Sequence, residues 1–160
     1  MAYRSRILKE AQEASKLNDK SIFLFMNDTS IASWKAYMIG PDDSPYKDGI
    51  FELSINLGNY PMQPPKVFFL TKIFHPNIHF QTGEICLEVF KENWTPSWTL
   101  ESIIRAILFL LSNPNPDSPL NCDAGNLIRK GDMKGFWSMA RMYTNELAVN
   151  RKEISDILGN

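Results

Sequence analysis

The sequence predicts an α+β fold with an N-terminal helix, a four-stranded antiparallel meander sheet, a long active-site loop and then C-terminal helices. Helical periodicity occurs near the start and again after residue 98, and four short apolar runs lie between. The links between those runs are short and rich in Gly, Pro, Asn and Asp, as in an antiparallel meander. Its length of 160 residues suits one domain, so we expect residues 1–160 to form a single domain.

The first element is predicted to be an amphipathic helix that ends near Asn18. Its apolar positions recur at helical spacing and are Tyr3, Ile7, Ala11, Ala14 and Leu17. Charged residues such as Arg4 and Glu13 occupy its other faces.

Four apolar runs predict the strands, and they are Ile22–Met26, Trp34–Ile39, Phe51–Leu57 and Val67–Leu70. In the third run, apolar and polar residues alternate with the period of a half-buried strand. From Lys72 to Trp98 the sequence follows neither period. Long loops inside compact domains are uncommon and are often functional, so this segment is where we expect the chemistry.

The later helices have clear boundary signals. Thr99 is a plausible N-cap, Asn113-Pro114 stops the helix that follows, and its wide apolar face predicts the central core helix. A short helix is expected from Ala124 to Lys130, and Asp132 is placed to cap a last long helix. One side of that helix is predicted to carry Met133, Phe136, Trp137, Ala140, Tyr143 and Leu147.

Composition excludes several functions. Lys+Arg 17 against Asp+Glu 18 gives a net charge of −1, which argues against nucleic-acid binding. No phosphate-binding loop, dinucleotide fingerprint or nucleophile elbow occurs. The most apolar run, Ile103–Leu111, is interrupted by Arg105, and the start has no secretory signal. Two cysteines are too few for a disulfide scaffold, so we expect a soluble intracellular protein with no membrane span.

Cys86 is the candidate nucleophile because it lies among apolar neighbours inside the irregular segment, where a thiol can be accessible. The alternative is that it is a small buried hydrophobe. The side-chain amide of Asn77 could stabilise a developing oxyanion, and the alternative is that it only forms a hydrogen bond within its own turn. A zinc site built from His75, His79, Cys86 and Cys122 is a further alternative, but its spacing is poor and no metal is expected.

Motifs around this segment resemble the active-site block of ubiquitin-conjugating enzymes. They are His75-Pro76-Asn77, Gly83-Glu84-Ile85-Cys86-Leu87 and Trp94-Thr95-Pro96. The resemblance continues on both sides, in the family's order, at residues 40–46, 49–51, 60–67 and 115–120. It implies the fold predicted above. It also implies that Cys86 accepts ubiquitin as a thioester from the activating enzyme, which uses the ATP, so that this chain needs no cofactor.

A narrower resemblance, at residues 82–88, 117–127 and 135–144, is to the peroxisomal branch of the family. It implies a cytoplasmic protein that is recruited to the cytosolic face of the peroxisomal membrane by a membrane-anchored peroxin. It further implies RING-type peroxisomal ligases as partners and the matrix-protein import receptor as substrate.

The resemblance also assigns roles to individual residues. Asn77 matches the residue that holds the loop and stabilises the oxyanion, and His75 orders the loop. Asp117 and Ser118 match the gate opposite the cysteine, although many relatives have an acidic residue where Ser118 stands. The partner-binding positions are Arg6 and Lys9 for the activating enzyme, and Met62, Pro96 and Ser97 for the ligase. Two alternatives remain, a non-catalytic binding module on the same fold and a carrier of a ubiquitin-like modifier.

Overall fold

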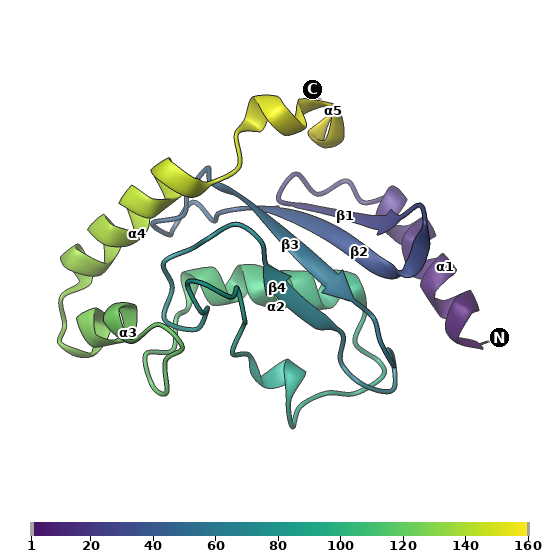
Figure 1. Ribbon diagram of the computed structural model, residues 1–160, viewed down its shortest axis with the longest axis horizontal. Helices are drawn as coiled ribbons and strands as arrows, with labels where there is room; N and C mark the ends of the chain where they lie inside the picture. The colour runs from purple at the N-terminus through teal and green to yellow at the C-terminus, as the bar shows by residue number, and fades with distance from the viewer. Residues whose placement is uncertain (1, 160) are drawn as a thin grey trace.

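The computed structural model describes residues 2–159, and its strands form one antiparallel sheet in the order β1-β2-β3-β4 (Figure 1). The strands are β1 (Ile22–Asn27), β2 (Ser30–Ile39), β3 (Ile50–Asn56) and β4 (Lys66–Phe69). The helices are α1 (Ala2–Ser15), α2 (Leu100–Ser112), α3 (Cys122–Arg129), α4 (Met133–Leu147) and α5 (Ser155–Leu158), with short 3-10 helices η1 (Glu88–Phe90) and η2 (Arg151–Ile154). The predicted order of elements and the meander topology are confirmed.

Most predicted boundaries of helices and strands lie within one residue of the observed ones, and three differ by two residues or more. Helix α1 ends at Ser15 rather than near Asn18, because the amides of Lys16 and Leu17 already bond three residues back in a tightened turn. Strand β2 begins at Ser30, since the Asn27 side chain accepts from the Thr29 amide (2.8 Å) and closes a tight hairpin. Helix α3 begins at Cys122, before the predicted start.

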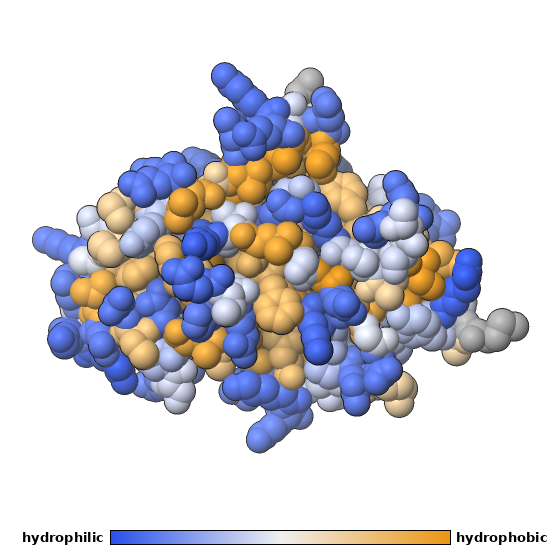
Figure 2. Space-filling view, in the orientation of Figure 1, coloured by the Kyte–Doolittle hydropathy of each residue, from blue (hydrophilic) through white to orange (hydrophobic). Residues whose placement is uncertain are grey.

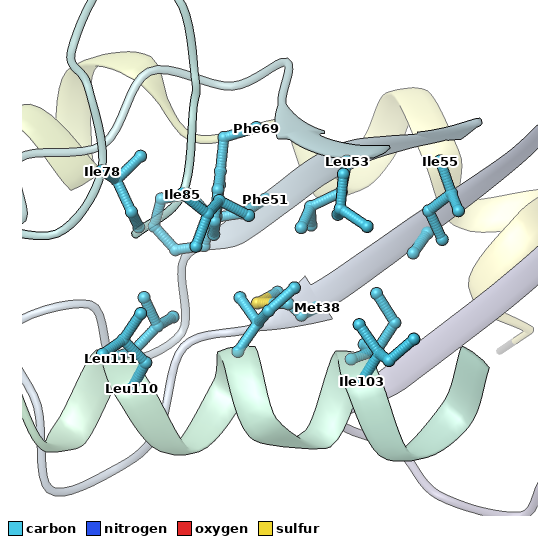
Figure 3. Packing of buried hydrophobic residues seen from close by; sticks show 14 of the residues in the cluster. Met38, Phe51, Leu53, Ile55, Phe69, Ile78, Ile85, Ile103, Leu110 and Leu111 are labelled. Carbon is cyan, nitrogen blue, oxygen red and sulfur yellow. The ribbon is translucent and has the colours of Figure 1, made fainter. Parts of the chain in front are cut away.

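The core lies between the sheet and α2 (Figure 3). Met38, Phe51 and Leu53 point from the strands toward Ile103 and the Leu110–Leu111 pair of the helix. At the start of α2, Thr99 and Ser102 each accept a hydrogen bond from the other's backbone amide, which satisfies two N–H groups at the helix end. The predicted central core helix is confirmed, and burying each such side chain contributes roughly 1.5–3 kcal/mol.

The opposite face of the sheet is covered in part by the C-terminal segment. Tyr37 and Ile50 point away from α2 and form a second small core with Ile154. The Val149 amide donates to the Ile50 carbonyl (2.8 Å), and Figure 1 shows α5 and α2 on opposite sides of the sheet. No helix within residues 2–159 is long and apolar enough to cross a membrane.

The predicted apolar side of α4 is partly wrong. Phe136 and Ala140 are buried, but Met133, Trp137 and Leu147 are 44%, 42% and 39% exposed. Thr144 is buried instead, and its hydroxyl donates to the Ala140 carbonyl (2.8 Å). Helix α4 therefore packs through a narrower apolar stripe than its composition indicates. On the face of the molecule shown in Figure 2, apolar residues lie interspersed with hydrophilic ones.

Candidate active site

The segment between β4 and α2 is irregular, yet backbone hydrogen bonds hold it in place. The Phe69 amide donates to the Gly83 carbonyl (2.9 Å), and the Cys86 amide donates to the Asn77 carbonyl (2.8 Å). Gly83 has a φ of +76°, and a Cβ at this position would lie 1.9 Å from the Phe69 carbonyl oxygen. Only glycine therefore allows the loop to approach β4 this closely.

His75 is fully buried and has a partner at each ring nitrogen. Nε2 lies 2.8 Å from the Leu110 carbonyl and Nδ1 lies 3.0 Å from the Asn77 amide. Because a carbonyl only accepts and an amide N–H only donates, the ring is neutral with its proton on Nε2. Burial lowers the pKa of His75 to about 4, so the imidazole stays neutral near pH 7 and ties the loop to α2.

Asn77 joins the cysteine loop to the loop after α2. Its Nδ2 donates to the Asn115 carbonyl (2.7 Å) and its Oδ1 accepts from the Asn115 amide (2.8 Å). The side chain is 3% exposed, and one of its two Nδ2 protons has no acceptor among the described residues. The amide thus fixes the loop and retains one further N–H to donate.

The segment that carries Asp117 and Ser118 is anchored on both sides. Asn77 holds Asn115 before it, and the Pro76 carbonyl accepts from the amides of Leu120 (2.8 Å) and Asn121 (3.1 Å) after it. Asp117 and Ser118 are exposed between these anchors, and Ser118 has a φ of +55°. The structure therefore attaches the predicted gate directly to the cysteine loop.

Cys86 is a free, half-buried cysteine at the end of this clamped loop. Lys91 Nζ lies 3.4 Å from Cys86 Sγ, a contact that could not be predicted from the sequence because nothing in the spacing distinguishes Lys91 from other exposed lysines. No imidazole or carboxylate among the described residues hydrogen-bonds the thiol. The site thus presents a nucleophile that can form a thioester without a dedicated base of its own.

The four residues of the alternative zinc site have other partners or lie apart. His75 uses both ring nitrogens, and His79 Nδ1 accepts from the amides of Gln81 and Thr82. Cys122 is exposed at the start of α3. Within residues 2–159, no group of three or more His, Cys, Asp or Glu side chains could hold a metal ion.

The two residues predicted to bind the activating enzyme, Arg6 and Lys9, differ in their contacts. Arg6 is bonded internally, since its guanidinium donates to Glu10 Oε2 (2.9 Å), the Tyr60 hydroxyl (3.0 Å), and the carbonyls of Pro96 (2.9 Å) and Trp98 (2.6 Å). Lys9 is exposed on α1. Arg6 thus connects α1 to the two loops predicted to dock a ligase.

Those two loops lie side by side. Trp94 Nε1 donates to the Pro61 carbonyl (3.0 Å), which joins the loop of Met62 to the loop of Pro96 and Ser97. Met62 is 74% exposed, and Pro96 and Ser97 are exposed as well. A hollow next to them is lined by Tyr3, Arg6 and residues 58–63. The structure therefore places the three residues predicted to bind a ligase at one accessible surface.

This fold and this thiol loop define a class. The family model "Ubiquitin-conjugating enzyme" matches residues 6–144, so the chain belongs to the ubiquitin-conjugating enzymes. Members of this family act without a cofactor of their own, as the sequence analysis expected.

Within the family, the predicted peroxisomal branch is confirmed. The chain is 53% identical to Protein PEROXIN-4 of Arabidopsis thaliana over 154 residues, which cover 94% of this chain and 98% of that protein. It is 54% identical to the ubiquitin-conjugating enzyme E2 pex4 of Dictyostelium discoideum over 142 residues (88% and 95%). Among solved structures, the H. polymorpha ubiquitin-conjugating enzyme Pex4p, crystallised with the soluble domain of Pex22p, matches with a TM-score of 0.87 and 32% identity, covering 94% of this chain and 100% of that one.

Proposed function

We propose that this enzyme carries ubiquitin on Cys86 and, at the cytosolic face of the peroxisomal membrane, passes it to the matrix-protein import receptor with the help of a RING-type ligase. The observation that carries the proposal is the free Cys86 thiol at the end of a clamped loop in a member of the ubiquitin-conjugating family. The similarity to peroxin-4 proteins supports the peroxisomal setting.

Two acyl transfers follow from this assignment. Cys86 Sγ attacks the thioester that joins ubiquitin to the activating enzyme, and the activating enzyme's thiol leaves. An acceptor amine or thiol then attacks the carbonyl carbon, the bond to Cys86 Sγ breaks, and the departing sulfur takes a proton. The remaining Nδ2 proton of Asn77 is proposed to stabilise the oxyanion of the second step.

The other site residues have supporting roles in this proposal. His75 holds the loop and does not exchange protons, since its ring is buried and both nitrogens are bonded. Asp117 and Ser118 form the gate through which the acceptor approaches. Serine provides no charge at this position, which suits a thiol acceptor better than a lysine that needs help to lose its proton.

Partner docking is proposed at separate surfaces. Lys9 and the α1 surface around Arg6 meet the activating enzyme, and Met62, Pro96 and Ser97 meet the ligase. A membrane-anchored peroxin holds the enzyme at the organelle, by analogy with the Pex4p structure, which contains the soluble domain of Pex22p.

The first experiment mixes the protein with ubiquitin, activating enzyme and ATP, followed by gels with and without reductant. We expect a one-ubiquitin mass shift that disappears on reduction and in Cys86→Ala, whereas Cys122→Ala keeps it. No shift beside an active control enzyme would favour the non-catalytic module. A shift only with a ubiquitin-like protein and its own activating enzyme would identify a different modifier.

The peroxisomal role is tested in cells that lack their own form of this enzyme. We expect the wild-type chain, but not Cys86→Ala, to restore import of a fluorescent matrix protein and reducible ubiquitination of the import receptor. Restored receptor ubiquitination by Cys86→Ala would contradict the proposal.

A further inference from the structure

Tyr46, in the loop between β2 and β3, is a fully buried tyrosine whose side chain touches the cysteine loop. Its hydroxyl donates to the Phe74 carbonyl (2.6 Å), and no other group within residues 2–159 donates to that carbonyl. Its ring lies against the imidazole of His75, with 5.8 Å between the ring centroids. Burial raises the pKa of Tyr46 well above its ordinary value, so the hydroxyl stays protonated and remains a donor. Tyr46 therefore contacts two consecutive residues of the segment that leads into Asn77.

The loop that carries Tyr46 is itself held from two sides. The Gly49 amide, at the end of this loop, donates to the Tyr46 carbonyl (2.9 Å). From α4, the Arg141 guanidinium donates to the carbonyls of Pro45 (3.2 Å) and Lys47 (2.6 Å), the two residues that flank the tyrosine. The backbone at this position is thus fixed by its own loop and by a helix, so the tyrosine hydroxyl is held at a defined place.

The contacts of Tyr46 lead to the side chain that is proposed to stabilise the oxyanion. His75, whose ring Tyr46 touches, accepts a hydrogen bond from the Asn77 amide through Nδ1 (3.0 Å). A displacement of about 1 Å in a positioned group can cost about 10²-fold in rate. The placement of the Phe74 carbonyl and the His75 ring therefore bears on whether the free Nδ2 proton of Asn77 meets the oxyanion.

We propose that Tyr46 is a positioning residue for the transfer of ubiquitin from Cys86, because it sets the placement of Asn77. It acts through its two contacts, the Phe74 carbonyl and the His75 ring. This inference rests on the proposed function, since it requires the Cys86 thioester and the oxyanion role of Asn77. Tyr46 is fully buried, so it touches neither the thioester nor the acceptor.

Two variants isolate this contribution. Tyr46→Phe removes the hydroxyl, keeps the buried ring and leaves the Phe74 carbonyl without its donor. Arg141→Gln loosens the same loop from α4 without changing the tyrosine. The matched control is Tyr37→Phe, which removes the hydroxyl of a tyrosine that is 4% exposed and lies on the other face of the sheet.

The test loads the full chain and its variants with ubiquitin and follows discharge of the thioester to free cysteine, at a temperature at which each variant is folded. We expect Tyr46→Phe to load at the wild-type rate and to discharge about tenfold more slowly, and Arg141→Gln to discharge about threefold more slowly. Tyr37→Phe should discharge at the wild-type rate. In the Asn77→Ala background, Tyr46→Phe should change the discharge rate by less than about twofold, because the group that it positions is absent.

A spectroscopic measurement reports on the same placement. In nuclear magnetic resonance spectra, the side-chain Nδ2 proton signals of Asn77 should shift in Tyr46→Phe and stay in place in Tyr37→Phe. Signals that do not move in Tyr46→Phe would contradict the inference.

A merely structural role for Tyr46 would give different kinetics. Tyr46→Phe would then lower the unfolding midpoint yet discharge like the wild type, or it would slow discharge equally with and without Asn77, and either result would overturn the inference. If Tyr46→Phe fails to fold, Arg141→Gln with and without Asn77→Ala decides by the same criteria. A wild-type chain that forms no thioester would overturn the proposed function, and this inference with it.

Discussion

Two buried polar networks hold the functional loops, and they are made of different kinds of groups. Near Cys86, the neutral side chains of His75 and Asn77 bond mainly to backbone groups of Leu110 and Asn115. At the loops proposed to dock a ligase, the ion pair of Glu10 and Arg6 contacts the Tyr60 hydroxyl from both partners.

The two networks connect different elements of the fold. The neutral network joins two loops and α2 through bonds to backbone carbonyl and amide groups, which substitutions other than proline leave in place. The charged network joins α1, two loops and the start of α2, because Glu10 also accepts from the Leu100 amide (2.7 Å). Loss of one charged member leaves the other charge and its hydrogen bonds incomplete. Mutations in the neutral network should therefore mainly lower the reaction rate, and mutations in the charged network should mainly lower the free energy of unfolding.

The largest expected effect is on the neutral network. Asn77→Ala removes the clamp on Asn115 and the free Nδ2 proton, and loss of one oxyanion donor typically costs about 10²–10³-fold in rate. We expect single-turnover discharge from Cys86 to fall by about this factor while thioester loading is spared. The exposed control Asn18→Ala should discharge at the wild-type rate. Normal discharge by Asn77→Ala would remove its catalytic role.

Acid should weaken the neutral network through His75. Its pKa is about 4 in the fold against an ordinary value of 6.5, so between these values the unfolded chain binds the extra proton. The stabilisation is complete above pH 6.5 and is lost as pH falls toward 4, at a cost of about 3 kcal/mol.

Urea unfolding at pH 7, 6, 5 and 4 measures this loss. His75→Gln should lack this part of the pH dependence, and His79→Gln should keep it. An identical slope in wild type and His75→Gln would show that other groups govern acid stability.

In the charged network, Glu10→Ala should reduce the free energy of unfolding by about 2–3 kcal/mol. This is less than the usual cost of breaking a buried ion pair, because the Arg6 side chain keeps 28% of its surface exposed. Glu13→Ala, on an exposed part of the same helix, should change stability by less than about 0.5 kcal/mol. Equal unfolding midpoints for the two variants would mean that the Glu10 contacts contribute no net stability.

The smallest effect is expected from removing the Tyr60 hydroxyl in the charged network. Burial raises the pKa of Tyr60 well above its usual value, so its hydroxyl remains a donor to Glu10 Oε2 (2.5 Å). Tyr60→Phe removes that bond and keeps the ring, so we expect a loss of about 1 kcal/mol and weaker ligase binding. Calorimetry and a ligase titration measure both quantities. Unchanged ligase affinity would show that the charged network does not position the docking loops.

The periodic elements could be predicted from the sequence because their signals are local. The alternation in β3 and the wide apolar face of α2 each specify an element and its buried side. The buried face of α4 was harder to predict. Trp137 is apolar, yet it remains 42% exposed. The Thr144 hydroxyl donates to a carbonyl of the same helix, so this polar residue can be buried.

The irregular segment alone made Cys86 and Asn77 candidates, but the roles of the remaining site residues could be predicted only through the family motifs. Periodicity says nothing about Asn115, whose backbone holds Asn77 from 38 residues away, or about the internal bonds of Arg6. Both interactions depend on loops that meet only after the sheet and α2 have packed. The family motifs identify such residues, but they do not show which of their atoms already form hydrogen bonds within the protein.

Gly83 has a consequence for how this chain can vary. The position lies in a loop, where substitutions are commonly tolerated, yet any side chain there would collide with the β4 backbone. The neighbours Gln81 and Thr82 are exposed and have room for other residues. A library of variants would therefore retain glycine at position 83 and diversify around it, so the most restricted position near the nucleophile is one with no side chain at all.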